Sequence, residues 1–71
     1  YDIIGANMLA DIIMQFNPQV ADVLKPGGTY ITGGIIDVRE DEVLASFADN
    51  GFTVQQRFED KGWLVFVLKH E

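Results

Sequence analysis

The residue with the clearest chemical potential is Asn7, which stands where a short apolar run ends and a helical pattern begins. The run from Asp2 to Ala6 is typical of a short strand that is buried on both faces. Open α/β sheets bind their ligands at the carboxyl ends of the strands. A neutral amide there can accept a hydrogen bond from an amine without the charge pairing that would favour the unreactive ammonium. The alternative is that Asn7 only caps the following helix, a position that asparagine favours.

Two further groups of residues lie near predicted strand ends. Met8 and Leu9 could line a ligand pocket, although apolar residues at the start of a helix more often belong to the core. Thr32, Gly33 and Gly34 stand at the end of the next predicted strand. Glycines there would let a substrate chain approach the backbone closely, and a simple bend in the strand is an equal alternative.

Composition narrows the class of protein. With 71 residues, 48% of them apolar, the chain fits one small folded domain. The absence of cysteine excludes a thiolate metal site and the lone His70 cannot build one on imidazoles, so we expect no metal site. The net charge of −6 argues against nucleic-acid binding and fits a basic substrate such as a lysine-rich protein.

No apolar run approaches the ~20 residues of a membrane span and no signal peptide is recognisable, so we expect no membrane association and a cytoplasmic location.

The elements that must position these residues follow from hydrophobic periodicity. Apolar residues at three- and four-residue spacing predict helical structure over 9–24. Proline costs ~3 kcal/mol inside a helix, so Pro18 predicts two short helices, with Asn17 capping the second. The stretch from Lys25 to Gly28 is a helix stop. Residues 29–36 then form a β-branched and aromatic strand.

A second helix follows this strand. Asp37 and Glu40 have the spacing of a capping box, which predicts a helix start. The apolar face of that helix comprises Val43, Leu44, Phe47 and Ala48. Asn50 and Gly51 end it.

The C-terminal segment predicts a hairpin around residues 60–62. In residues 52–59 the alternation places Phe52, Val54 and Phe58 on one face. Residues 63–68 are apolar at every position, and a strand that is apolar on both faces lies inside a sheet. We therefore predict that 63–69 lies between 29–36 and 52–59, antiparallel to both. Trp63 is expected to serve packing.

The predicted fold class is α/β: two parallel strands, a C-terminal antiparallel hairpin, and helices on one face. The helices share a face because crossovers between parallel strands are right-handed in ~98% of cases. The other face and one edge of strand 2–6 would be uncovered. Because the chain starts on Tyr1 inside a strand pattern, we expect a fragment. Either the missing N-terminal half or a second copy of the chain would then cover the open face.

Four motifs of the chain resemble the C-terminal half of a class I S-adenosylmethionine-dependent methyltransferase. They are "YDIIGANMLAD", "VLKPGGTYITGGII", "NGF" and the closing "WLVFVLK". The chain is similar in particular to the ribosomal protein L-eleven methyltransferase family (PrmA), whose fourth strand is followed by Ala-Asn-hydrophobic-Leu-Ala-Asp. "LKPGG" specifies only the superfamily, whereas "ANMLAD" followed by "GGI" is narrower. The resemblance spans the whole chain, with departures at Gly5 and Met8.

The resemblance implies a Rossmann-like enzyme that transfers methyl groups from S-adenosylmethionine to amines of a large-subunit ribosomal protein. Residues 1–71 would be the C-terminal part of its catalytic domain, and the fragment alone would be inactive. The glycine-rich loop and the acidic residue that holds the cofactor ribose have no counterpart here, so the chain alone should not bind the cofactor. The implied site residues are Asn7 for catalysis, Asn7, Met8 and Leu9 for the cofactor, and Thr32, Gly33 and Gly34 for the substrate.

Two other classes of function stay open on the sequence. One is another class I methyltransferase, acting on a glutamine amide or on RNA, although the acidic charge weakens the RNA version. The other is a non-catalytic α/β assembly module whose open sheet face docks on a partner.

Overall fold

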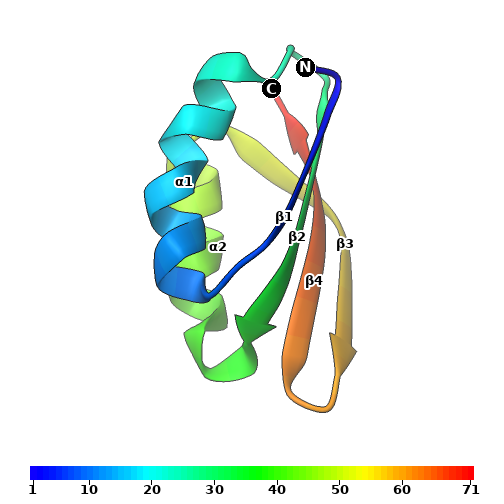
Figure 1. The fold of residues 1–71 in the computed structure, drawn as a ribbon. Helices are drawn as coiled ribbons and strands as arrows, with labels where there is room; N and C mark the ends of the chain where they lie inside the picture. Colours follow the sequence, from blue (N-terminus) through cyan, green and yellow to red (C-terminus); the bar gives the residue numbers. More distant parts are fainter.

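The computed structural model describes residues 1–71 as a four-stranded sheet with two helices on one face (Figure 1). In chain order the elements are β1 (Ile3–Asn7), α1 (Ala10–Val23), β2 (Thr29–Ile36), a 3-10 turn (Asp37–Arg39), α2 (Glu40–Asp49), β3 (Phe52–Asp60) and β4 (Trp63–His70). Neither helix has the length and hydrophobicity that crossing a membrane requires.

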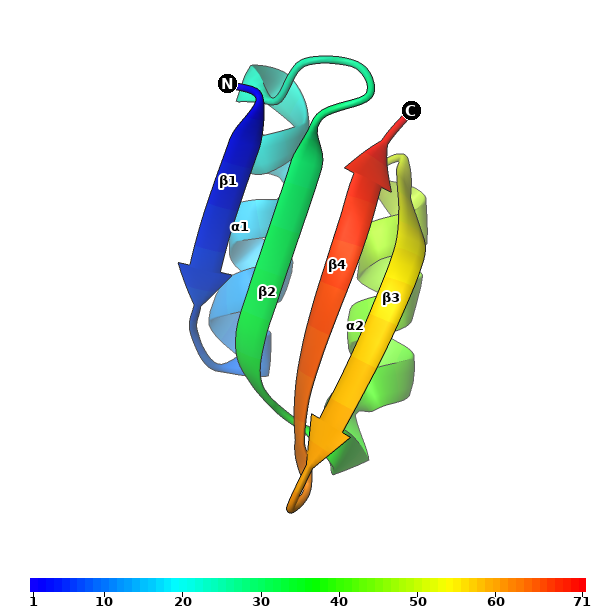
Figure 2. The ribbon, with the colours of Figure 1, turned by 90° about the vertical axis from the view of Figure 1, so that its right-hand side faces the viewer.

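The sheet has the strand order β1-β2-β4-β3 (Figure 2). β1 and β2 are parallel, and β4 is antiparallel to both of its neighbours. The predicted insertion of the last strand is therefore confirmed, together with the α/β class and the placement of both helices on one face. β3 and β4 are joined by Lys61 and Gly62, which have positive φ angles of 53° and 82°. These are the angles of a tight two-residue hairpin turn.

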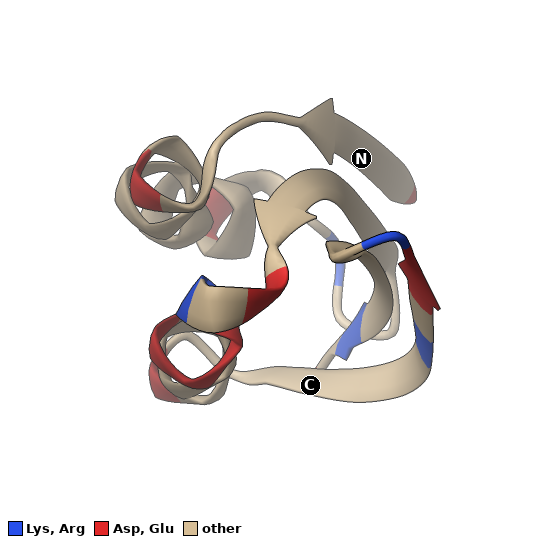
Figure 3. Ribbon diagram, turned by 90° about the horizontal axis from the view of Figure 1, so that it is seen from below, with Lys and Arg blue, Asp and Glu red and all other residues tan.

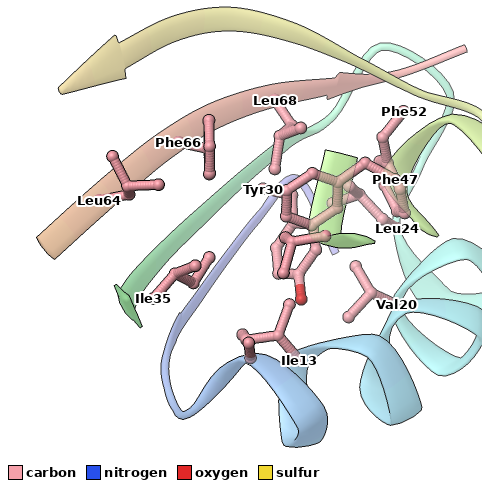
Figure 4. Close-up of a cluster of buried hydrophobic side chains, with 12 residues drawn as sticks. Ile13, Val20, Leu24, Tyr30, Ile35, Phe47, Phe52, Leu64, Phe66 and Leu68 are labelled. Carbon is pink, nitrogen blue, oxygen red and sulfur yellow. The ribbon is translucent and has the colours of Figure 1, made fainter. Parts of the chain in front are cut away.

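The core lies between the helices and the sheet (Figure 4). Its aromatic rings meet at steep angles, with centroids of Tyr30 and Phe47 6.1 Å apart and those of Phe47 and Phe66 5.7 Å apart. The buried apolar residues are Ala10, Ile13, Val20, Leu24, Tyr30, Ile35, Val43, Phe47, Phe52, Leu64, Phe66 and Leu68. Both helices and the strands β2, β3 and β4 contribute buried apolar side chains, so the core holds the helices in one position over the sheet.

α1 is one continuous helix with Pro18 inside it, so the predicted break into two helices is wrong. A break would turn the second half of the apolar stripe out of phase with the first. Because the helix continues, Ile13 and Val20 both point into the core and have no exposed surface. Each such burial contributes roughly 1.5–3 kcal/mol, which together offsets the ~3 kcal/mol that an interior proline costs.

Asn17 does not cap a helix but lies in the core, at the centre of a polar network. Its Nδ2 donates to Oγ of Ser46 on α2 at 2.9 Å. Its Oδ1 accepts from the hydroxyl of Tyr30 on β2 at 3.0 Å. The Tyr30 hydroxyl points toward α1 in Figure 4, and burial raises its pKa to about 12. The network therefore ties both helices to the sheet, with its buried polar atoms paired.

A bulge in β3 reverses the faces of its second half. The register against β4 shifts between Val54 and Gln56. Phe52 is consequently buried, whereas Phe58 is 54% exposed on the opposite face. The prediction that these two side chains share a face with Val54 is wrong for Phe58, because one extra residue in a strand inverts the alternation beyond it.

The same bulge turns Arg57 toward α2, where it pairs with Glu40. Nη2 of Arg57 donates to Oε1 of Glu40 at 2.9 Å, and Nε donates to its other oxygen. These hydrogen bonds lower the pKa of Glu40. The predicted capping box is therefore wrong: residues 37–39 form a 3-10 turn, and no side chain caps α2. A bidentate pair of hydrogen bonds from one guanidinium stabilises the Glu40 carboxylate more than a single hydrogen bond from a backbone N–H would.

No helix covers the face of the sheet that is turned toward the viewer in Figure 2. Several apolar side chains on this face are exposed. We call it the open sheet face and define it by Ile3, Ile31, Phe58, Trp63 and Val65, whose exposed fractions lie between 37% and 66%. The outer edge of β1 has no strand partner. Both features agree with the prediction that this chain covers only one side of its sheet.

We expect Tyr30→Phe to destabilise the fold by about 1–3 kcal/mol, because Oδ1 of Asn17 would stay buried without its donor. Tyr1→Phe is the matched control, since Tyr1 is 74% exposed. Equilibrium denaturation in urea measures both changes. Equal stability of the two variants would contradict the role given to the network.

Candidate functional site

Asn7 is the last residue of β1 and lies beside Gly33 of β2 in the parallel register. Its side chain is exposed and makes no hydrogen bond to another group of the chain. The N-cap residue of α1 is Leu9, and no side chain caps that helix. Asn7 therefore does not cap the helix, and its amide remains available for a ligand at the carboxyl ends of two parallel strands.

A bulge in β2 brings the backbone of Gly34 against this amide. The register between β2 and β4 shifts between Thr32 and Ile35, and Gly34 has a φ of 78°. A Cβ atom on Gly34 would lie 2.6 Å from Oδ1 of Asn7. The backbone N–H of Met8 also donates to the carbonyl of Gly33 at 3.1 Å. The positive φ of Gly34 favours glycine, and the backbone O and N of Met8, which would lie 3.2 and 3.4 Å from the new Cβ, limit the space for any side chain there.

Two cavities adjoin this point. The larger has a volume of about 650 Å³, lies on the open sheet face, and is lined by residues that include Asn7, Gly33, Gly34 and Trp63. The smaller has a volume of about 200 Å³ and lies between the start of α1 and the 3-10 turn. Its lining includes Leu9, and the two cavities share Gly34 and Trp63.

The structure brings together some of the predicted site residues and separates others. Asn7, Gly33 and Gly34 line one cavity, and Leu9 lines the other. Met8 instead packs its side chain against the core. The side chain of Thr32 is fully buried with Oγ1 unpaired, on the side of the sheet that faces the helices. Only the backbone of Thr32 can therefore reach a ligand in the larger cavity.

Trp63 is the residue of this region that the sequence analysis missed. It was expected to serve packing, yet it is 50% exposed and lines both cavities. It pairs with Ile36, the last residue of β2, so it lies at the same rim of the sheet as Asn7. Its place directly after the hairpin turn, opposite the end of a parallel strand, is the sequence signal that indicates this position.

An ion pair borders the smaller cavity. Nη2 of Arg39 donates to Oδ1 of Asp11 at 2.6 Å, and its Nε donates to Glu42. The hydrogen bonds to Asp11 and then to Glu42 raise the pKa of Arg39. The pair joins α1 to the 3-10 turn and α2 beside this cavity.

A single protein-family model matches this chain along its whole length. The model of "Ribosomal protein L11 methyltransferase (PrmA)" matches residues 1–71. The chain belongs to this family. A PrmA-family relative from Dictyoglomus thermophilum is 45% identical over 71 residues, which are 100% of this chain and 24% of the relative. One from Halalkalibacterium halodurans is 38% identical over 69 residues, which are 97% of this chain and 22% of the relative. The chain thus spans about a quarter of the length of these PrmA relatives.

Solved structures show the same arrangement. The ribosomal protein L11 methylase of Lactobacillus delbrueckii subsp. bulgaricus superposes with a TM-score of 0.93 at 25% identity, over 99% of this chain and 37% of that one. M1.HpyAVI in its SAM complex superposes with a TM-score of 0.79 at 10% identity, over 99% of this chain and 44% of that one. At that identity the likeness shows the fold alone. The PrmA family and the methyltransferase-like fold of this chain are therefore established, as its sequence motifs predicted.

We expect Gly34→Ala to destabilise the protein more than Gly27→Ala. Both glycines have a positive φ, 78° and 79°, but a Cβ at Gly27 would meet nothing within 4 Å. Gly27→Ala should cost about 1–2 kcal/mol through backbone strain. Gly34→Ala should cost about 1 kcal/mol more, because the backbone O and N of Met8 would lie only 3.2 and 3.4 Å from the new methyl group.

Equilibrium denaturation of both variants, each with and without Asn7→Ala, measures these differences. Asn7→Ala removes the nearby amide oxygen but leaves the backbone of Met8 in place, so the additional cost of Gly34→Ala should persist in the double variant. Equal costs for the two glycine substitutions would show that Gly34 is required only for its backbone angle.

Proposed function

We propose that this chain is the C-terminal part of a class I methyltransferase catalytic domain that methylates amines of a large-subunit ribosomal protein, with S-adenosylmethionine as the methyl donor. The observation that carries the proposal is the unpaired Asn7 amide at the carboxyl ends of β1 and β2, seated on Gly34 beside a cavity. Membership of the PrmA family supports the choice of reaction and substrate.

The chemistry of methyl transfer to an amine suits a neutral amide. When bound, S-adenosylmethionine supplies a methyl group on a sulfonium leaving group, and the amine nitrogen must approach that carbon in line. Oδ1 of Asn7 can accept a hydrogen bond from the amine N–H, which leaves the nitrogen lone pair free. Because the amide has no charge, it does not favour the ammonium form, which has no lone pair to donate.

The residues around Asn7 have different parts in the proposed site. Gly33 and Gly34 leave room for the backbone or side chain of a substrate, and Thr32 contributes only backbone there. Leu9 is exposed and can contact a ligand directly. Met8 is the weakest of the proposed cofactor contacts, because its side chain packs against the core.

The charge of the chain fits a basic substrate protein. Its net charge is −6, and acidic residues gather around the start of α2 (Figure 3). This is the end of the molecule at which β1 and β2 terminate. The acidic residues at this end are Asp37 of the 3-10 turn and Glu40, Asp41 and Glu42 of the first turn of α2. Glu40 and Glu42 are paired with Arg57 and Arg39, so the attraction for a lysine-rich protein rests on the net charge of −6, which also repels the phosphates of RNA.

The rest of the site would come from the part of the protein that the relatives have and this chain lacks. The open sheet face and the outer edge of β1 are the surfaces that such a part would cover. This chain alone would then lack the main anchors of the cofactor. Its exposed apolar face and free strand edge would instead favour self-association.

The function is tested in a chimera in which this chain replaces the matching 71-residue segment of the Dictyoglomus thermophilum relative. We expect methyl transfer to a ribosomal protein and none to ribosomal RNA. Asn7→Ala should lower kcat/KM by roughly 10²-fold, because the amine is no longer held in line. Asn50→Ala is the matched control, since Asn50 lies at the far end of α2 and donates to the carbonyl of Ser46. Unchanged kcat/KM in Asn7→Ala would refute the catalytic role assigned to Asn7. Methylation of ribosomal RNA would show that RNA, and not a ribosomal protein, is the substrate.

The 71-residue chain by itself should not bind S-adenosylmethionine in calorimetric titration, and it should self-associate in sedimentation. Both expectations follow from the uncovered sheet face, which leaves the site without one wall. A stable monomer at high concentration would contradict the expected self-association. Measurable cofactor binding by the chain would contradict the division of the site between two parts of the protein.

A further inference from the structure

The outer edge of β1 carries backbone groups that have no partner strand. The N–H of Met8 donates to the carbonyl of Gly33 on β2, so the backbone groups of the even-numbered residues of β1 face β2. Successive residues of a strand point these groups to opposite sides, so the N–H and C=O groups of the odd-numbered residues face away from the sheet. These residues are Ile3, Gly5 and Asn7. The edge can therefore accept a further strand.

This edge is complementary to itself. If β1 of a second copy pairs with it in antiparallel fashion, Gly5 lies opposite Gly5 of that copy, and Ile3 lies opposite Asn7. Each of these is a hydrogen-bonded pair, in which the two residues exchange both N–H···O bonds. The two-fold axis of such a pairing is perpendicular to the sheet, so the helices of both copies lie on the same face.

The flank of α1 that faces away from α2 carries an uncovered apolar stripe. On the flank toward α2, Asp11 pairs with Arg39 of the 3-10 turn. Residues at spacings of four, three and four fall on one line along a helix, and one such line lies on the opposite flank of α1. This α1 stripe comprises Ile12, Phe16, Gln19 and Val23. Ile12 and Val23 are 44% and 50% exposed, and a hollow of about 150 Å³ adjoins Ile12.

The α1 stripe is also complementary to itself, because its spacing is the same in both directions. When two α1 helices pack antiparallel through it, Ile12 lies opposite Val23, and Phe16 lies opposite Gln19. None of the four side chains is charged, so the net charge of −6 is not concentrated at this contact. Such a row of side chains is the ordinary surface through which two helices pack.

One two-fold axis fits both surfaces. Tyr30 pairs with Ile4 in the register of β1 and β2, and its hydroxyl donates to Asn17 in the middle of α1. The middle of α1 is therefore level with the middle of β1. In Figure 2, α1 lies behind β1 and β2, whereas α2 lies behind β4 and β3. The α1 stripe and the free edge of β1 consequently lie on the same side of the molecule.

We propose that the 71-residue chain forms a two-fold dimer through the outer edge of β1 and the α1 stripe. The two four-stranded sheets then join into one continuous sheet, with all the helices on one face. The open sheet face is a poorer contact surface, because a cavity of about 650 Å³ hollows it at Gly5 and Gly33, and two such faces would enclose voids.

The dimer has a consequence for the proposed site. The part of the protein that the relatives have and this chain lacks would cover the same edge of β1. A chain that is paired with a second copy is therefore closed to that part and has no complete methyltransferase site.

Sedimentation equilibrium of the 71-residue chain measures the dissociation constant of the dimer. Ile12→Glu should raise this constant at least about 100-fold, because it places an unpaired carboxylate from each copy in an apolar contact. Phe58→Glu is the matched control: it adds the same charge on the open sheet face, where Phe58 is 54% exposed. It should change the dissociation constant by less than about threefold.

A second pair of variants tests the strand edge. Ile3→Pro removes an N–H of the outer edge and no hydrogen bond to β2, so it should raise the dissociation constant at least about tenfold. Ile3→Ala is its control, because it shortens the same side chain and keeps the N–H. Far-UV circular dichroism checks that each variant is folded.

Cross-linking tests the α1 stripe independently. The chain has no cysteine, so Gln19→Cys introduces a single thiol into the stripe. A short bismaleimide should join two copies of this variant. It should not join two copies of Asp41→Cys, whose exposed thiol lies on α2, away from the proposed contact.

The proposal is overturned if the chain sediments as a monomer at high concentration. It is also overturned if Ile12→Glu or a folded Ile3→Pro dimerises as tightly as the unsubstituted chain. Loss of the dimer in Phe58→Glu alone would assign the contact to the open sheet face. If Ile3→Pro does not fold, the cross-link decides, and its absence in Gln19→Cys overturns the proposal. None of these measurements involves methyl transfer, so failure of the proposed function would appear separately, as a chimera without activity.

Discussion

The contact between Gly34 and the side chain of Asn7 is the constraint on which the site depends. β1 and β2 are parallel, so their ends meet at one rim, but parallel pairing alone would leave the amide free to rotate. The bulge in β2 places a glycine Cα where any Cβ would collide with Oδ1 of Asn7. Glycine at this position leaves room for the amide, whose hydrogen-bonding groups stay available to a ligand.

Hydrogen bonds in the core connect β2, the strand that carries Gly34, to both helices. The Tyr30 hydroxyl fastens β2 to Asn17, and Asn17 fastens α1 to Ser46 of α2. α1 begins three residues after Asn7, so the network also fixes the chain that leaves the site. The helices therefore support one side of the sheet, while the ligand-binding rim and the open sheet face lie on surfaces that they do not cover.

The sequence predicted the arrangement of elements better than it predicted their irregularities. Residues 63–68 are apolar at every position, which was sufficient to place β4 inside the sheet, and Asn7 was correctly placed at a strand end. Pro18 was misleading, because the local penalty of a proline is outweighed by core contacts that form only in the folded chain. Phe58 was misplaced because a bulge in β3 shifts register without changing the residue types that a pattern records. Trp63 was undervalued because a run that is apolar on both faces does not show which of its residues lie on the open sheet face. Leu9 and the smaller cavity depend on how α1 meets the 3-10 turn, which no local pattern specifies.

The central claim is that a neutral amide at Asn7 holds an uncharged amine for methyl transfer. The most direct test is the dependence of kcat/KM on pH in the chimera that carries Asn7→Asp. A carboxylate at that position would stabilise the ammonium form, so the account predicts that the rise in rate moves to higher pH than with asparagine. The same pH profile for both residues, at the same maximal rate, would contradict it.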